Sequence, residues 1–151
     1  MPVEMKQGSV FDSECYAIAH GVNVQGVMGA GIAYTVKTRF PQAFRVYRML
    51  CREDRILKPG DFVAVAAEDL GADRTRTMRL VYNLATQQWA GPSASLEWIQ
   101  KAANGMFEDL MERGLATVAM PRIGCGLGGL EWEDVARLFE HEQIRVEVWT
   151  P

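Results

Sequence analysis

Short apolar runs and longer stretches with a helical repeat alternate along this chain. Runs of about four to eight mainly apolar residues, bounded by turn residues, are typical of buried strands. A segment in which apolar and polar positions alternate is typical of a half-exposed strand. The apolar runs are Cys15 to Val22, Phe62 to Ala67, Met78 to Leu84 and Leu115 to Met120, and the alternating segment carries Ile144, Val146 and Val148. A further candidate is a short first strand from Val3 to Lys6.

Between these strands, apolar residues recur every three or four positions, which is the spacing of one helix face. The strongest such pattern predicts a helix from Ala94 to Arg113, with Gly114 at its C-terminal end. Either Ser93 or Ser95 is a suitable N-cap for it. Weaker patterns predict helices over Ile32 to Arg39, Ala43 to Arg52 and Trp132 to His141, with Pro41 ending or kinking the first of them.

The order of these elements predicts the fold class. Strands alternate with helices, and crossovers long enough to hold a helix are typical of an α/β protein with a largely parallel sheet. The polar stretch from Asp69 to Thr75 lacks such a helix and contains Gly71, so it predicts a hairpin loop. We therefore expect an α/β sandwich with a largely parallel sheet.

Length and composition are those of an ordinary globular domain. The chain has 151 residues, of which 48% are hydrophobic and 23% charged, so we expect a single domain over residues 1–151. The formal net charge is −3 and no basic stripe is present, which argues against binding of duplex nucleic acid through its phosphates. No apolar run reaches the roughly 20 residues of a membrane span, and we expect no membrane association.

The cysteines and histidines argue against structural metal and disulfide chemistry. Cys15, Cys51 and Cys125 are odd in number, widely spaced and without a Cys-x-x-Cys pair, and the chain has only 2 histidines. This pattern fits neither a zinc site nor a disulfide framework, so we expect no metal and no cofactor. The first residues lack the layout of a signal peptide. Together these features predict a reduced, cytoplasmic, monomeric protein.

Two glycine-rich loops each follow a predicted strand and lead into a predicted helix, at Gly26 to Gly31 and at Gly124 to Gly129. In open α/β sheets ligands bind at the carboxyl ends of strands, and backbone N–H groups at a helix start attract anions. Two such loops facing each other would suit a diphosphate, although each could also be a plain tight turn. Neither loop is a Walker A motif, and the first does not match the dinucleotide-binding fingerprint.

The residues in and around these loops resemble the ligand loops of macrodomains. The first match is Asn23-Val24-Gln25-Gly26-Val27-Met28-Gly29-Ala30-Gly31-Ile32-Ala33, and the second runs from Met120-Pro121-Arg122-Ile123 through Gly124-Cys125-Gly126-Leu127-Gly128-Gly129 to Trp132. The similarity is greatest to the branch that contains the terminal ADP-ribose protein glycohydrolase and the ADP-ribose 1″-phosphate phosphatases. The resemblance implies a three-layer α/β/α sandwich with a mixed, largely parallel sheet and an ADP-ribose cleft at its crest.

The resemblance also assigns ligand contacts. The first loop would wrap the distal ribose and one phosphate, and the second would cradle the diphosphate with its backbone amides. Trp149 would stack on adenine, with an ordinary edge-strand aromatic as the alternative. Ser9 replaces an Asp with which relatives bind the adenine amino group, so a charge-assisted hydrogen bond is lost. The predicted ligand-binding residues are Ser9, Val10, Gly26, Met28, Gly29, Ala30, Gly31, Ile32, Arg122, Ile123, Gly124, Cys125, Gly126, Leu127, Gly128 and Trp149.

The same resemblance bears on catalysis. The glycohydrolase of this branch uses a Lys and an Asp where this chain has Gln87 and Gly128, so a Lys–Asp mechanism is rejected here. The phosphatase-like members carry a His at the spacing of His20, three residues before Asn23. His20 is therefore the candidate general acid or base and Asn23 the candidate orienter of the distal ribose. A buried structural histidine is the alternative for His20.

Three functions remain open at this point. The first is a hydrolase that acts on the distal ribose, with ADP-ribose 1″-phosphate as its substrate. The second is a non-catalytic reader of ADP-ribose or of ADP-ribosylated protein or nucleic acid. The third is a de-ADP-ribosylating hydrolase that works without the Lys–Asp pair. In each of them the partner is ADP-ribose or a small molecule or macromolecule that contains it.

Overall fold

A computed structural model describes residues 2–71 and 77–151. These residues form a six-stranded sheet with the strand order β1-β6-β5-β2-β4-β3, in which β3 is antiparallel to β4 and the other pairings are parallel. The strands are β1 (Glu4–Gln7), β2 (Ala17–Val22), β3 (Phe62–Asp69), β4 (Thr77–Ala85), β5 (Thr117–Met120) and β6 (Arg145–Thr150). The expected mixed, largely parallel sheet is confirmed.

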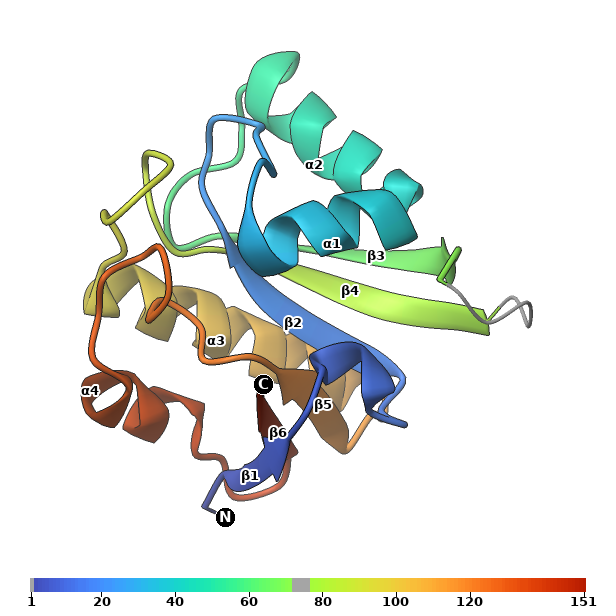
Figure 1. Ribbon diagram of the computed structural model, residues 1–151, viewed down its shortest axis with the longest axis vertical. Coiled ribbons are helices and arrows are strands. Elements are labelled where there is room, and N and C mark those ends of the chain that lie inside the picture. Colours follow the sequence, from blue (N-terminus) through green and yellow to red (C-terminus); the bar gives the residue numbers. More distant parts are fainter. Residues whose placement is uncertain (1, 72–76) are drawn as a thin grey trace.

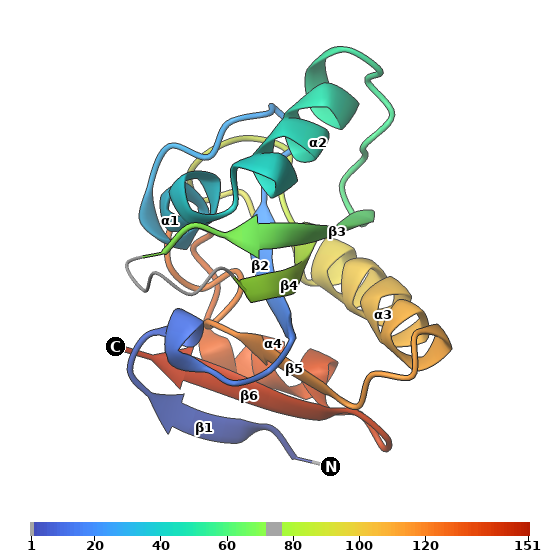
Figure 2. The ribbon, with the colours of Figure 1, turned by 90° about the vertical axis from the view of Figure 1, so that its right-hand side faces the viewer.

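Helices cover both faces of this sheet, as expected for a three-layer sandwich (Figure 1). The α-helices are α1 (Gly31–Arg39), α2 (Pro41–Arg52), α3 (Leu96–Glu112) and α4 (Trp132–Ala136), and short 3-10 helices span Val10–Asp12 and Arg137–Phe139. Figure 2 shows α1 and α2 on one side of the strands and α3 on the other. The predicted α/β/α architecture is therefore confirmed.

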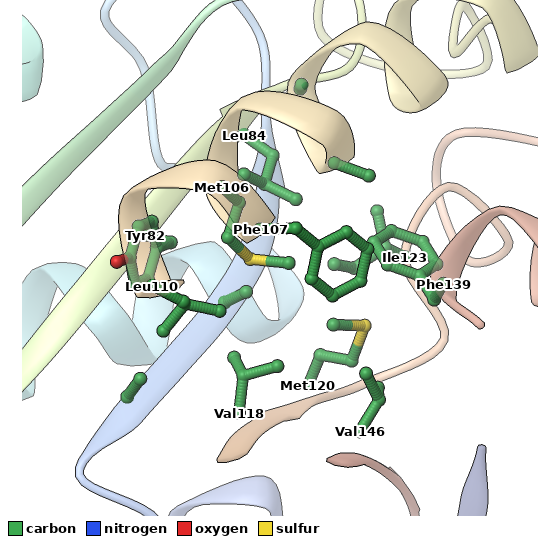
Figure 3. Packing of buried hydrophobic residues seen from close by; sticks show 14 of the residues in the cluster. Tyr82, Leu84, Met106, Phe107, Leu110, Val118, Met120, Ile123, Phe139 and Val146 are labelled. Carbon is green, nitrogen blue, oxygen red and sulfur yellow. The ribbon is translucent and has the colours of Figure 1, made fainter. Parts of the chain in front are cut away.

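Each face of the sheet has its own hydrophobic core. Alternate residues of β2 divide between the two cores: Ala19 packs on the α3 side and Ile18 on the α1 and α2 side. Figure 3 shows the α3 side, where Met106, Phe107 and Leu110 of the helix meet side chains of β5 and β6. Both cores end beneath the edge of the sheet where the parallel strands finish.

The helix boundaries differ from the predicted ones for local reasons. α1 ends at Arg39, and Pro41 begins α2 at a position where its missing N–H costs no hydrogen bond. Ser95 precedes α3 without a side-chain cap, and the Ser93 hydroxyl binds the Trp89 carbonyl instead. The predicted helix from Trp132 to His141 is shorter and splits into α4 and the 3-10 helix Arg137–Phe139.

The hairpin between β3 and β4 is partly as predicted. Asp69, expected in the loop, ends β3 and accepts two hydrogen bonds from the Arg39 guanidinium, at 3.0 and 2.8 Å. Residues 72–76 of the predicted loop lie outside the described residues. The 3-10 helix Val10–Asp12 was not predicted, and Ser9 caps it by accepting a hydrogen bond from the Phe11 N–H. Within the described part of the chain, no helix is long and apolar enough to cross a membrane.

Candidate ligand cleft

A cleft of about 860 Å³ opens at the carboxyl edge of the parallel strands. That volume lies within the roughly 300–1,000 Å³ typical of small-molecule sites. Six segments line the cleft: residues 8–10 after β1, 20–23 at the end of β2, parts of 27–33, parts of 86–91 after β4, 121–128 after β5, and 149–151 at the end of β6. The two glycine-rich loops therefore meet at one cavity, as a ligand site between them requires.

The structure brings most of the predicted site residues together around this cleft. Gly26 and Met28 are the exceptions: Gly26 packs against the Arg52 side chain, and Met28 is buried in the core beneath α1 and α2. The predicted residues that line the cleft are Ser9, Val10, His20, Asn23, Gly29, Ala30, Gly31, Ile32, Arg122, Ile123, Gly124, Cys125, Gly126, Leu127, Gly128 and Trp149.

The first loop, residues 23–30, is held by polar side chains. The Asn23 side-chain oxygen accepts hydrogen bonds from the Gln25 N–H at 2.9 Å and the Tyr47 hydroxyl at 2.7 Å, and its amide donates to the Val27 carbonyl at 3.0 Å. Arg52 donates to the Gln25 carbonyl from outside the cleft. Asn23 thus folds the loop on itself, and its role at the ribose stays a prediction.

The second loop, residues 121–130, is held by its own backbone. Cys125 N–H donates to the Arg122 carbonyl, Gly129 to Gly126, and Leu130 to Gly124 at 2.9 Å. A Cβ added at Gly128 would lie 2.7 Å from the Gly124 carbonyl oxygen and 2.8 Å from the Ala94 Cβ. A side chain at position 128 would therefore clash with the backbone of the loop and with Ala94.

His20 lies at the end of β2 and is only 1% exposed. Its Nε2 lies 2.6 Å from Oδ1 of Asn83, the residue beside it on β4. The Asn83 amide donates to the Val63 carbonyl at 3.5 Å, so Asn83 presents its oxygen to the ring and Nε2 carries the hydrogen. Sequence reasoning missed Asn83 because it lies 63 residues away along the chain.

The remaining ring nitrogen of His20 is an acceptor without a partner. Nδ1 is buried and has no hydrogen-bond partner among residues 2–71 and 77–151. Burial lowers the pKa of His20 from 6.5 to about 4, against the smaller opposite effect of the Asn83 hydrogen bond. His20 is thus neutral near pH 7, and the lone pair on its buried Nδ1 has no hydrogen-bond donor among the described residues.

The segment after β4 supplies cleft residues that sequence reasoning did not select. Gln87 lines the cleft, but its amide donates to the carbonyls of Trp89 at 2.6 Å and Gly91 at 2.8 Å. Ala90 N–H donates to the Gln25 side chain and so ties this segment to the first loop. Thr86 and Gly21 also line the cleft. Pairing of β2 with β4 brings these residues to the site, and no local motif marks them.

Trp149 lines the cleft at the end of β6, and a hydrogen bond to Glu147 holds its ring in place. Its indole N–H donates to Glu147 at 3.0 Å, and the same carboxylate oxygen accepts from the Ser13 hydroxyl at 2.7 Å. Burial acts to raise the pKa of Glu147, but these hydrogen bonds outweigh it and hold that pKa below its usual range. The ring lies beside Gly8, next to Ser9, so an aromatic face and a hydroxyl flank this end.

Cys125 is the thiol in the second loop. Burial raises the pKa of Cys125, and Arg122 offsets only part of that effect. Its sulfur lies 3.5 Å from the Ile123 carbonyl and is protonated near pH 7. Cys125 therefore serves the loop as a small neutral side chain. Among the described residues, no group of three His, Cys, Asp or Glu side chains is arranged to hold a metal ion.

Comparison with known proteins identifies the class to which this fold and cleft belong. The Macro domain family model matches residues 19–139, which include the last four residues of β2, both glycine-rich loops and α4. The chain belongs to the Macro domain family, as its two loop motifs predicted.

The sequence is also similar to individual proteins of known activity. The chain is 33% identical over 138 residues to the ADP-ribose glycohydrolase OARD1 of Homo sapiens, covering 89% of this chain and 81% of that protein. It is 32% identical over 129 residues to the DNA ADP-ribosyl glycohydrolase of Mycobacterium tuberculosis, covering 85% of this chain and 35% of that protein. An ADP-ribose 1″-phosphate phosphatase of Scheffersomyces stipitis is 24% identical over 154 residues, covering 91% and 89% of the two chains.

Solved structures show the same likeness. Thermosipho africanus DarTG in complex with ADP-ribose superimposes with a TM-score of 0.81 at 27% identity, covering 98% of this chain and 42% of that one. The macrodomain of Mycobacterium tuberculosis DarG gives a TM-score of 0.80 at 26% identity, covering 99% of each chain. The chain spans about a third of the length of the mycobacterial glycohydrolases that it matches (35%).

Proposed function

We propose that this protein binds ADP-ribose derivatives in its cleft and hydrolyses the phosphate from ADP-ribose 1″-phosphate. Two amide-rich loops meet at the cleft, and their backbone donors suit a diphosphate. A relative named ADP-ribose 1″-phosphate phosphatase and a structural neighbour in complex with ADP-ribose support this ligand class. The observation that carries the catalytic part is the neutral, unpartnered Nδ1 of His20.

In this proposal His20 is a base rather than an initial acid. Its Nδ1 takes a proton from a water molecule while the water oxygen forms a bond to phosphorus. The bond between phosphorus and the 1″ oxygen breaks, and the electron pair stays on that oxygen. The imidazolium then returns the proton to the leaving oxygen, which gives ADP-ribose and inorganic phosphate. A pKa of about 4 for His20 makes the base weak and the returning acid strong.

Phosphate release from ADP-ribose 1″-phosphate tests the proposal. His20→Ala should lower kcat by about 10²–10⁴-fold with a smaller effect on binding. Because alanine leaves the Asn83 oxygen without its donor, His20→Gln is the matched variant, with an amide that can still donate to Asn83. Wild-type turnover in both folded variants would show that His20 is structural. The wild-type rate should fall with acid near pH 4 rather than near 6.5.

A non-catalytic reader is the second candidate, and the scaffold roles of Asn23 and Gln87 favour it. Both side chains are occupied with holding loops, and position 87 has no Lys nucleophile. A reader would bind ADP-ribose tightly and release neither phosphate nor ADP-ribose. The third candidate is a de-ADP-ribosylating hydrolase, and the relatives named glycohydrolases support it. Parallel incubation with ADP-ribosylated protein and DNA tests it through the release of ADP-ribose.

We also propose that the protein acts as a monomer in the cytoplasm. Cys15, Cys51 and Cys125 are free thiols in the described structure, which suits a reducing compartment. Light scattering of the purified protein under reducing conditions should give the mass of one chain, and a dimer mass would contradict the proposal.

A further inference from the structure

Thr86 presents a polar atom at the cleft that the proposed mechanism does not use. The residue directly follows β4, is 1% exposed and lines the cleft. Its hydroxyl oxygen is buried and has no hydrogen-bond partner in the part of the chain that the structure describes. The backbone of Thr86 is fully engaged, since its N–H donates to Val22 and its carbonyl accepts from Ser95. The hydroxyl alone is left without a partner.

The hydroxyl packs directly against residue 21, which is glycine. A Cβ built on Gly21 would lie 2.9 Å from the Thr86 hydroxyl oxygen and 3.3 Å from a methyl carbon of Ile123. Ile123 belongs to the second loop, which also lines the cleft. Gly21 has no positive φ, so its backbone does not require glycine. Glycine is needed here because a side chain would crowd the Thr86 hydroxyl.

A buried hydroxyl without a partner is costly, because folding removes its hydrogen bonds to water and returns none. Such groups in native proteins call for a reason, and a ligand that supplies the missing partner is one. Thr86 thus combines a position among the residues that line the cleft with an unused donor beside the backbone of Gly21.

We propose that Thr86 is a specificity-determining residue whose hydroxyl donates a hydrogen bond to an oxygen of the bound ligand. The acceptor is an oxygen in the half of ADP-ribose that contains the diphosphate and the distal ribose. This proposal rests on the proposed binding of ADP-ribose.

Matched variants at position 86 separate ligand contact from a structural role. Thr86→Val keeps the shape and removes the hydroxyl, whereas Thr86→Ser keeps the hydroxyl and removes a methyl group. Calorimetry should show ADP-ribose affinity reduced at least about fivefold in Thr86→Val and within about twofold of wild type in Thr86→Ser. The thermal midpoint of Thr86→Val should equal or exceed that of wild type, because no protein hydrogen bond is lost.

Two further measurements complete the test. ADP lacks the distal ribose: a loss for both ADP and ADP-ribose assigns the contact to a phosphate, and a loss for ADP-ribose alone assigns it to the ribose. Gly21→Ala would place a methyl group 2.9 Å from the Thr86 hydroxyl oxygen and should weaken ADP-ribose binding by a similar factor. Unchanged affinity in Thr86→Val, or a loss accompanied by a lower thermal midpoint, overturns the inference. Wild-type protein that binds no ADP-ribose refutes the proposed function itself.

Discussion

The two loops that form the cleft are stabilised in opposite ways. The first loop keeps its shape through side chains that reach it, with Asn23, Tyr47 and Arg52 all bonded to its backbone or to one another. The second loop keeps its shape through backbone hydrogen bonds and through glycines that lie against their neighbours. The shape of the first loop therefore depends on polar side chains, and the shape of the second depends on glycines that have no side chain.

This contrast separates two kinds of sensitivity to mutation. Truncating a polar side chain should disturb the first loop, because no backbone contact replaces the lost hydrogen bond. Adding a methyl group should disturb the second loop, because its packing leaves no space at particular glycines. A charge added to either loop should affect the ligand rather than the fold.

The largest expected effect is the loss of ligand binding when a carboxylate is added to either loop. Gly29→Glu and Gly126→Glu should each abolish ADP-ribose binding, because like charge and bulk would face the diphosphate. An added Cβ meets only the Val27 side chain at 3.6 Å in the first case and nothing within 4 Å in the second, so Gly29→Ala and Gly126→Ala are controls with room. Calorimetry at millimolar ADP-ribose that shows normal affinity in a Glu variant would mean that its loop does not face the ligand.

Lowering the pH should reduce the stability of the fold through His20, which lies at the base of the first loop. The folded pKa of His20, about 4, lies below its ordinary value of 6.5, so the unfolded chain binds more protons between these pH values. This contribution to stability is complete above pH 6.5 and is lost as the pH falls toward 4, a change of about 3 kcal/mol. Urea unfolding of wild type and His20→Gln from pH 7 to 4 measures it. Equal pH dependence in the two proteins would contradict the assignment to His20.

Gly128→Ala tests the packing of the second loop. The added Cβ would approach the Gly124 carbonyl oxygen at 2.7 Å, and backbone cannot move aside cheaply. The free energy of unfolding should fall by about 1–3 kcal/mol. Gly126→Ala, where the space is open, should change it much less, and equal losses would show that the two glycines do not differ in packing.

Trp149 belongs to neither loop and should act independently of both. Stacking of adenine on its ring predicts that Trp149→Ala weakens ADP-ribose binding about tenfold, or about 1.4 kcal/mol. Trp149→Phe keeps an aromatic face and is the control. If Trp149→Ala binds ADP-ribose with wild-type affinity, Trp149 does not stack on adenine and is an ordinary edge-strand aromatic.

The smallest effect is expected at the tyrosine that holds the first loop. Tyr47→Phe removes a hydroxyl that donates at 2.7 Å to the side chain of Asn23, and the ring stays in place. Stability should fall by about 1 kcal/mol, since Asn23 retains its bond from Gln25. Thermal unfolding measures the loss, and an unchanged midpoint would mean that the remaining hydrogen bonds suffice.

Local patterns were enough to predict the fold and the two loops. The periodicity of Ala94 to Arg113 predicted α3 to within two residues at its start and one at its end. Glycine-rich loops after apolar runs marked both sides of the cleft. Patterns failed where a boundary depends on a distant partner: Asp69 is polar, yet it ends β3 because Arg39 pairs with it.

The same limit applies to the candidate site. His20 was selected from its spacing to Asn23, but its pKa and tautomer depend on Asn83, which only strand pairing brings near. Thr86 and Gly21 carry no motif, and they are noticed only from an unpartnered oxygen and the close packing around it. His141, at the end of the predicted last helix, accepts hydrogen bonds from the N–H groups of Gln143 and Ile144, and its ring centroid lies 4.6 Å from that of Phe107.

The pairing of β1 with β6 has a practical consequence for handling this protein. These strands run parallel, and Figure 2 shows the two chain ends at opposite ends of this strand pair. The last residues, Thr150 and Pro151, line the cleft. A linker or affinity tag joined after Pro151 would start beside the Trp149 end of the cleft and obstruct it. A tag placed before Met1 would lie at the opposite end of β1. Immobilisation for binding measurements should therefore use the N-terminus.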